Sequence, residues 1–172
     1  GDTYDVWGVW LNREDDERTP AQWLKAWNDK AEKQKADEDE GDEDDEEKTD
    51  LPEVTIDFDR LWERVGRITD LQGDEGRARV SADGKTIIFT AEHEGATDLY
   101  SVRWDGDDLK RLTTEAEPEQ YVFDSEGETV FYLDDNGLIK RVSLDGTAGD
   151  PVPFTARYEI DRRARREAVF DE

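Results

Sequence analysis

The 172-residue sequence contains no cysteine, no methionine and a single histidine. These absences limit the kinds of catalytic and metal-binding site that it can form. Without cysteine, the chain has no disulfide framework, no thiolate nucleophile and no thiolate metal site. No apolar run approaches the ~18 residues that a membrane span needs, and no signal peptide is visible. The absence of methionine, together with a strand pattern that begins at Thr3, predicts that the natural start of the protein lies upstream.

Positive charge is also scarce, because 48 Asp and Glu face only 23 Lys and Arg, for a net charge of −25. Nucleic acid and anionic membranes would both be repelled by this chain, so we expect neither as a partner. Between Asp37 and Asp50, eleven of fourteen residues are acidic and none is apolar. Such a segment cannot offset the entropy lost on ordering, and we predict that it is solvated and disordered.

The most informative positive feature is a repeat. The segment Val80–Phe89 has the pattern of strand, Asp-Gly turn and apolar strand, and Phe123–Tyr132 repeats it 43 residues later. Leu99–Gly106 is repeated in the same way by Ile139–Gly146, at an offset of 40. A period of about 40–45 residues made of short strands and turns is typical of β-propeller blades. We therefore predict an all-β fold, a partial β-propeller with two WD-like or TolB-like blades within residues 54–155.

Tight turns separate the predicted strands. Each contains a glycine that tolerates the positive φ of a short hairpin. These turns are Asp83-Gly84, Asp105-Gly106, Glu126-Gly127, Asn136-Gly137 and Asp145-Gly146. The first unit closes on Arg111-Leu112-Thr113, and the second on Pro153-Phe154-Thr155.

The segments around the two units have other patterns. Residues 1–12 are predicted to be a late strand of a preceding blade, because Tyr4–Leu11 matches Asp98–Trp104 in type. Residues 13–53 are predicted to be an insertion, a helix that fades near Lys35 into the acidic run. Its start is marked by Thr19 as N-cap, Pro20 at the first helical position and Gln22 three residues after the cap.

Two further elements are expected. Val54–Phe58 alternates as a strand, and Leu61–Ile68 runs into another. Residues 156–172 are predicted to form a C-terminal helix, with Asp161 as N-cap, that begins a downstream domain.

Two phrases resemble a known family. Val54–Ile68 resembles the phrase V-x-I-D-F-D…R-V-x-R-L/I, which opens a propeller blade in tricorn-type serine peptidases. Phe154–Glu172 is similar to the junction between their last blade and the helical start of the peptidase region. The resemblance covers most of the chain. It implies a large, often oligomeric hydrolase whose propellers guide peptides toward a serine active site built by domains downstream, including a PDZ-like module.

The resemblance also sets the expected partners. They are the remainder of the parent protein, peptides and further copies in a homo-oligomer, in the cytoplasm or alternatively the periplasm. No catalytic residue of the family falls within these residues. The sequence itself agrees, because His93 lies in a polar hairpin and the four serines lie at repeated turn or strand positions. No catalytic triad, cofactor loop or specific metal site is therefore expected. We assign the neighbouring acids Asp57 with Asp59, and Asp134 with Asp135, to turns and blade junctions rather than to acid–base catalysis.

Two groups of residues are candidates for binding. Trp23 and Trp27, with Leu24 and Ala31, form an apolar stripe on the predicted helix. The stripe contacts either another subunit or domain, or a face of the chain's own propeller. The second group is the only basic cluster, which either pairs with nearby acids or clamps a peptide carboxylate. Its members are Arg162, Arg163, Arg165 and Arg166.

Three functional hypotheses follow. The preferred one is a non-catalytic propeller segment of a tricorn-like serine peptidase, which serves substrate access and domain assembly. The alternative is a TolB-like propeller that binds another protein and hydrolyses nothing. The third is an acidic scaffold that binds basic proteins through residues 37–50.

Overall fold

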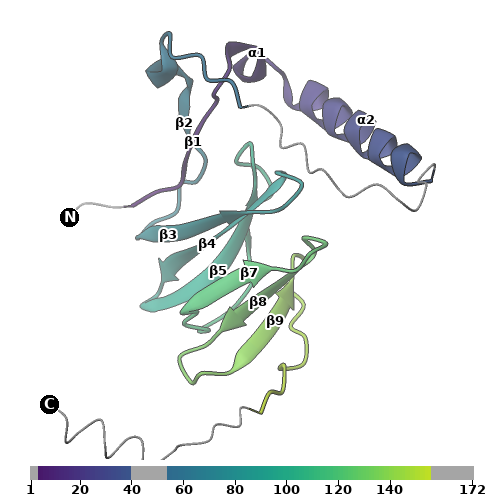
Figure 1. Cartoon of the computed structure of the whole chain (residues 1–172). Coiled ribbons are helices and arrows are strands. Elements are labelled where there is room, and N and C mark those ends of the chain that lie inside the picture. Colours follow the sequence, from purple (N-terminus) through teal and green to yellow (C-terminus); the bar gives the residue numbers. More distant parts are fainter. Residues whose placement is uncertain (1–3, 40–53, 156–172) are drawn as a thin grey trace, which may run out of the picture.

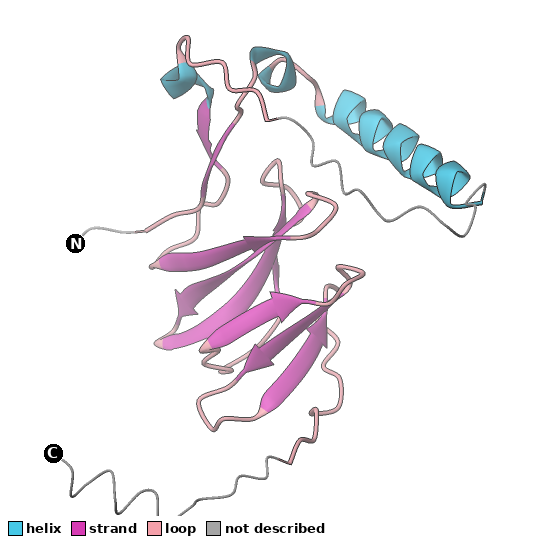
Figure 2. Ribbon diagram, in the orientation of Figure 1, coloured by secondary structure: helices cyan, strands magenta, loops and turns pink. Residues whose placement is uncertain are grey.

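A computed structural model describes residues 4–39 and 54–155 of the chain (Figure 1). The fold is mostly β, with antiparallel sheets and few helices (Figure 2), which confirms the predicted all-β class at that level. No helix in these two ranges has the length and apolar character of a membrane span. Most of the acidic run, the predicted C-terminal helix and its four arginines lie outside the described residues.

The strands form three antiparallel groups. The first is a ribbon of β1 (Trp7–Val9) and β2 (Val65–Arg67). The second is a four-stranded sheet of β3 (Glu75–Val80), β4 (Thr86–His93), β5 (Ala96–Arg103) and β6 (Lys110–Arg111). The third is a three-stranded sheet of β7 (Gln120–Phe123), β8 (Thr129–Leu133) and β9 (Ile139–Ser143). The two sheets coincide with the two predicted repeat units.

The five predicted glycine turns are confirmed. Their glycines have φ between 75° and 89°. In each turn the glycine N–H donates to the carbonyl three residues earlier, and a nearby Asp carboxylate accepts further backbone N–H groups. Asp134 is typical, because its Oδ1 accepts from the N–H groups of Asn136 and Leu138 at 3.0 and 2.8 Å. The assignment of this acid to a turn is therefore confirmed.

The helical insertion begins as its sequence indicates. A short helix α1 (Arg13–Asp16), which the sequence did not predict, precedes α2 (Pro20–Asp39). The start of α2 is a capping box, since the Thr19 N–H donates to Gln22 Oε1 at 2.7 Å and the Gln22 N–H donates to Thr19 Oγ1 at 3.4 Å. The helix continues past Lys35, the position at which it was expected to fade.

Two strand predictions between the insertion and the sheets are corrected. Val54–Phe58 forms no strand, because the Asp57 N–H donates to the Leu11 carbonyl and the Asp57 carbonyl accepts from Arg64, rather than either group pairing with a neighbouring strand. Leu61–Arg64 forms a 3₁₀ helix, η1, and only Val65–Arg67 of the second predicted strand pairs in a ladder.

The three groups stack with the four-stranded sheet in the middle. Its front face, defined by Ile87, Phe89 and Val102, packs against Val6 and Ile68, which adjoin the two strands of the ribbon. Its back face, defined by Ile88 and Leu99, packs against the three-stranded sheet. The residues that the latter contributes are Tyr121, Val130, Tyr132 and Val142. Both faces of the sheet are therefore buried over most of β4 and β5.

A carboxylate with no exposed surface joins the middle sheet to the next one. Asp98, on β5, accepts hydrogen bonds from Arg111 Nη2 at 2.5 Å, Thr113 Oγ1 at 2.9 Å and the Ala116 N–H at 3.1 Å. Thr113 Oγ1 in turn accepts from the Leu99 N–H at 2.9 Å. We call this set the Asp98 clasp. It fixes β6, and the loop that leads to β7, against β5.

The ribbon has a clasp of the same design. Asp5 binds Arg67 at 2.9 Å, and Thr69 Oγ1 accepts from the Val6 N–H at 3.1 Å. These residues are spaced as in the Asp98 clasp, since Arg67-Ile68-Thr69 takes the place of Arg111-Leu112-Thr113. The main-chain bonds repeat as well, because Ile68 N–H donates to the Val6 carbonyl as Leu112 N–H does to that of Leu99. The ribbon thus has the local geometry of the β5–β6 pair.

The Asp98 clasp makes the fold sensitive to acid. Burial alone raises the pKa of Asp98, but hydrogen bonds from Arg111, Ala116 and Thr113 outweigh it, so the pKa lies below its ordinary value. A lowered pKa contributes stability that is present above the unfolded value of about 3.9 and is lost as pH falls through the folded value. We expect the unfolding free energy to fall progressively as the pH drops below about 4.

Asp98→Asn is expected to lower the free energy of unfolding at pH 7 by about 2–4 kcal/mol, because Arg111 loses its charged partner. Asp70→Asn is the control: this acid is 88% exposed and pairs with Arg67, so its loss should cost less than about 0.5 kcal/mol. Urea denaturation followed by circular dichroism measures both values. Equal stabilities of the two variants would contradict the role of Asp98.

Candidate binding groove

A buried arginine organises the segment in which a strand was expected. Arg64 is 5% exposed, and its guanidinium donates to three backbone carbonyls from two separate segments. Nε bonds to the Trp10 carbonyl at 3.0 Å, Nη1 bonds to that of Asp59 at 2.8 Å, and Nη2 bonds to that of Asp57. The end of β1 and residues 57–59 are therefore held together by one side chain.

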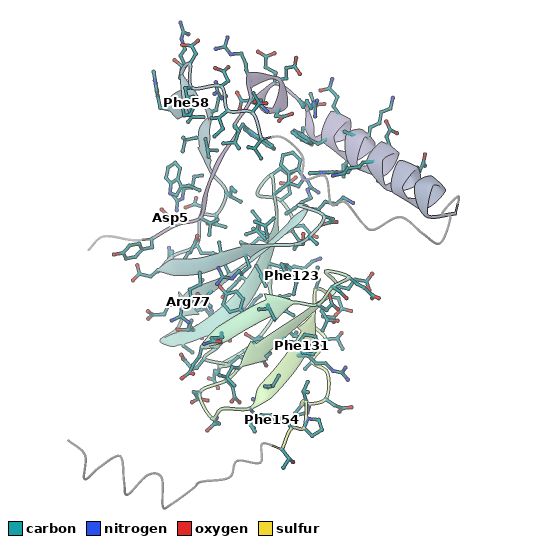
Figure 3. All side chains as sticks on the ribbon, in the orientation of Figure 1. Asp5, Phe58, Arg77, Phe123, Phe131 and Phe154 are labelled. Atoms are coloured by element: carbon teal, nitrogen blue, oxygen red, sulfur yellow. The ribbon has the colours of Figure 1, made fainter. Side chains whose placement is uncertain are left out.

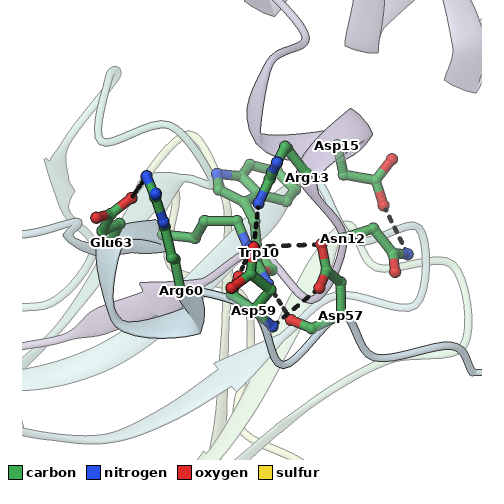
Figure 4. Close-up of polar contacts among 9 residues, drawn as sticks. Trp10, Asn12, Arg13, Asp15, Asp57, Asp59, Arg60 and Glu63 are labelled. Carbon is green, nitrogen blue, oxygen red and sulfur yellow. Dashed lines mark hydrogen bonds and ion pairs between the residues drawn. The ribbon is translucent and has the colours of Figure 1, made fainter.

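The acidic residues in this region also help to hold residues 57–59 against the neighbouring segments. Asp57 Oδ1 accepts from the Asp59 N–H at 2.9 Å, which is a turn contact, and its Oδ2 lies 3.7 Å from Arg64 Nη1. Asp59 binds Arg13 of α1 at 3.0 Å (Figure 4). These contacts place Asp57 and Asp59 at a junction between segments, as the sequence predicts.

Four tryptophans meet beside this junction. Trp10 stacks on Trp23 with ring centroids 5.0 Å apart and an interplanar angle of 15°. Trp104 makes edge contacts with Trp10, Trp23 and Trp27 at 5.5, 6.0 and 5.3 Å. Edge-to-face pairs of this kind are each worth about 0.5–1.5 kcal/mol beyond the area that they bury. The cluster attaches α2 to the turn that follows β5.

Two cations and one hydrogen bond complete the attachment. Arg18 lies 4.8 Å from the centroid of the Trp23 ring, and Lys85 lies 6.0 Å from that of Trp27. Trp23 Nε1 donates to the Asp15 carbonyl at 3.2 Å. Trp23 and Trp27 therefore pack against their own chain, which was one of the two alternatives. Contact of these residues with another protein stays a prediction.

A groove of about 670 Å³ opens between the ribbon and the four-stranded sheet. Its middle is lined by Gly8 and Gly66 on one side and by Val80, Ile87 and Trp104 on the other. Gly8 and Gly66 are cross-strand partners, so the ribbon presents no side chain at this level. A Cβ atom at Gly8 would lie 2.9 Å from Ile68 Cδ1, whereas one at Gly66 would meet nothing within 4 Å.

The walls of the groove are mainly apolar. Trp104 Nε1, which is buried, has no hydrogen-bond partner among the described residues. His93 lies elsewhere, exposed at the end of β4. Within residues 4–39 and 54–155, no group of His, Asp and Glu could hold a metal ion.

Sequence reasoning missed three of the important residues here. Trp10 and Trp104 were read as ordinary strand positions, although they lie 94 residues apart and touch in the fold. Arg64 lies within the family phrase, and the sequence indicates no role for it. A cation between Glu63 and Val65 in a short segment does not by itself indicate burial.

Comparisons with known proteins do not identify a family for this chain. No family model matches the chain, and no curated protein matches it. Among solved structures, the chain is similar to TolB from Acinetobacter baumannii, with 21% identity and a TM-score of 0.34. That similarity covers 51% of this chain and 34% of the TolB chain, so the chain spans about a third of its length. At this level it concerns the fold alone, and it says nothing of a tricorn-type peptidase.

Trp104→Ala is expected to release α2, because it removes three aromatic contacts and about 2–3 kcal/mol of stabilisation. Trypsin should then cleave at Lys25 and Lys30 much faster than in the unsubstituted chain, while the β-sheet signal in circular dichroism persists. Trp62→Ala is the matched control, since Trp62 is 74% exposed and outside the cluster. Unchanged cleavage in α2 would show that the cluster does not hold it.

Proposed function

We propose that this chain is a run of consecutive β-propeller blades that carries no catalytic residue and acts as part of a larger protein. The observation that carries the proposal is the repetition of one local geometry. The clasp, the main-chain bonds and the Arg-x-Thr spacing recur in the ribbon and in the four-stranded sheet. The ribbon is then the outer half of a preceding blade, with the helical insertion between its two strands.

We further propose that the parent is a tricorn-like serine peptidase. The support is the phrase Val54–Ile68, whose Arg64 and Asp57 join the insertion to β1. In such a protein this segment guides peptides toward the active site and assembles with the other blades and with PDZ-like and peptidase domains. The partners are then its own parent and its peptide substrates, in a cytoplasmic homo-oligomer.

The groove favours a second candidate function. A mainly apolar hollow of about 670 Å³ suits a TolB-like module that binds another protein. In that case the parent hydrolyses nothing, and the groove is the surface that binds the other protein. A strand or loop with apolar side chains is the chemistry that this surface would accept.

Sequencing the gene upstream and downstream of the codons for this chain distinguishes the peptidase proposal from the binding-module proposal. A continuing frame that encodes further blades, a PDZ-like module and a domain with serine and histidine is the expected result. A stop codon shortly after Glu172, with only propeller repeats upstream, would replace the peptidase proposal by the binding module.

Activity gives an independent test. The 172-residue chain should hydrolyse no fluorogenic peptide, since within residues 4–39 and 54–155 no serine hydroxyl is hydrogen-bonded to its single histidine, His93. The parent should hydrolyse such peptides, and Trp104→Ala in the parent should raise KM for long peptides with little change for dipeptide substrates. Peptide hydrolysis by the 172-residue chain itself would overturn the non-catalytic assignment.

A further inference from the structure

One main-chain bond recurs at the outer edge of all three groups of strands. In the ribbon and in the four-stranded sheet, it is donated by the N–H groups of Ile68 and Leu112. In the three-stranded sheet, the Val152 N–H donates to the Ile139 carbonyl at 2.9 Å, and Ile139 is the repeat equivalent of Leu99. The bond therefore places Val152 where the other two groups have Ile68 and Leu112.

The donors of the clasp are missing around this third bond. Where the four-stranded sheet has Arg111 and Thr113, the three-stranded sheet has Pro151 and Pro153. Proline has neither a side-chain donor nor a backbone N–H, so these two residues can donate to no carboxylate and to no strand. Among the described residues, the hydrogen bonds that residues 148–155 make to β9 are main-chain bonds only.

The acid of the clasp is missing as well. Leu138 stands in the place of Asp98. The three-stranded sheet does have a buried carboxylate, Asp134, but it lies at the end of β8. It accepts the N–H groups of Asn136 and Leu138 and binds Lys140 at 2.8 Å. Asp134 therefore stabilises its own hairpin and does not hold the outer segment.

The outer segments thus differ in what must break before they open. For β6 to leave its sheet, Asp98 must lose its bonds from Arg111 and Thr113, although its carboxylate has no exposed surface. This loss is costly, so β6 opens only together with the sheet around it. Opening of residues 148–155 instead releases main-chain groups that water can satisfy. Phe154, at the lower end of the stack, is 62% exposed and buries little apolar surface (Figure 3).

We propose that residues 148–155 form a strap that detaches from β9 while the stacked sheets stay folded. The chain can then change direction at the outer edge of the three-stranded sheet, which makes the strap a hinge. The clasps allow no such change after the ribbon or after β6. This inference goes beyond the proposed function and holds for a peptidase segment and for a binding module alike.

Native-state hydrogen exchange compares amides that make the same bond. The Val152 N–H is expected to exchange at least about 100-fold faster than that of Leu112. Low concentrations of urea should leave its rate unchanged, because opening of the strap exposes little surface. The Val142 N–H, on β9 itself and 2% exposed, should exchange as slowly as that of Leu112. This contrast would show that the strap opens while the strand beneath it does not.

Three substitutions together rebuild the clasp: Leu138→Asp, Pro151→Arg and Pro153→Thr. All three positions are exposed, so the changes disturb no core. The triple variant should slow exchange of the Val152 N–H at least about 10-fold, because a charged hydrogen-bonded pair then holds the strap. Leu138→Asp alone is the matched control and should leave the rate unchanged, since the prolines supply no donor.

The converse variant, Thr113→Val, weakens the clasp of the four-stranded sheet. It removes the hydroxyl that joins Asp98 to the Leu99 N–H. Exchange of the Leu112 N–H should become at least about 10-fold faster, while that of Val142 stays slow. This variant decides the question if circular dichroism shows that the triple variant is unfolded.

Four results would overturn the proposal. The Val152 N–H could exchange as slowly as that of Leu112, or its rate could rise with urea in step with that of Leu112. A folded triple variant could leave the Val152 rate unchanged, as fraying unrelated to the clasp would, or Thr113→Val could leave the Leu112 rate unchanged. None of these results bears on the gene sequence that tests the peptidase proposal, so the two can fail separately.

Discussion

The buried carboxylate of Asp98 is the constraint on which the rest of the structure depends. It has no exposed surface, and burying an unpaired charge would be costly. The cost is offset because Arg111, Thr113 and the Ala116 N–H all donate to it. These donors come from β6 and from the loop beyond it. One side chain therefore fixes the last strand of a sheet and the path of the chain into the next sheet.

Stacking follows from this path. Once the loop after β6 is fixed, β7 begins over the back face of the four-stranded sheet, and the apolar residues of both close on each other. The ribbon reaches the front face in the same way, through Asp5, Arg67 and Thr69. The acidic composition is partly a result of this design, because Asp residues also close the hairpin turns by accepting backbone N–H groups.

Much of the fold could be predicted because its signals are local. Glycine turns, strand alternation and the Thr19–Gln22 capping box each depend on a few neighbouring residues, and all are present. The strand expected at Val54–Phe58 does not form, because the buried Arg64 binds the Asp57 carbonyl and the Asp57 N–H donates to the Leu11 carbonyl, so neither group is left for a neighbouring strand. The groove could not be predicted either, since it depends on contact between Trp10 and Trp104, far apart in the chain.

Native-state hydrogen exchange at residue resolution tests the central claim most directly. The clasp is expected to protect the amide N–H groups of Leu99, Leu112 and Ala116 as strongly as that of Phe89 in the core of β4. Slow exchange of all four, lost together as denaturant is added, would show that the clasp and the stacked sheets open as one unit. Exchange of the Ala116 N–H at the rate of an exposed loop would contradict the account, because the carboxylate of Asp98 would then not hold the two sheets together.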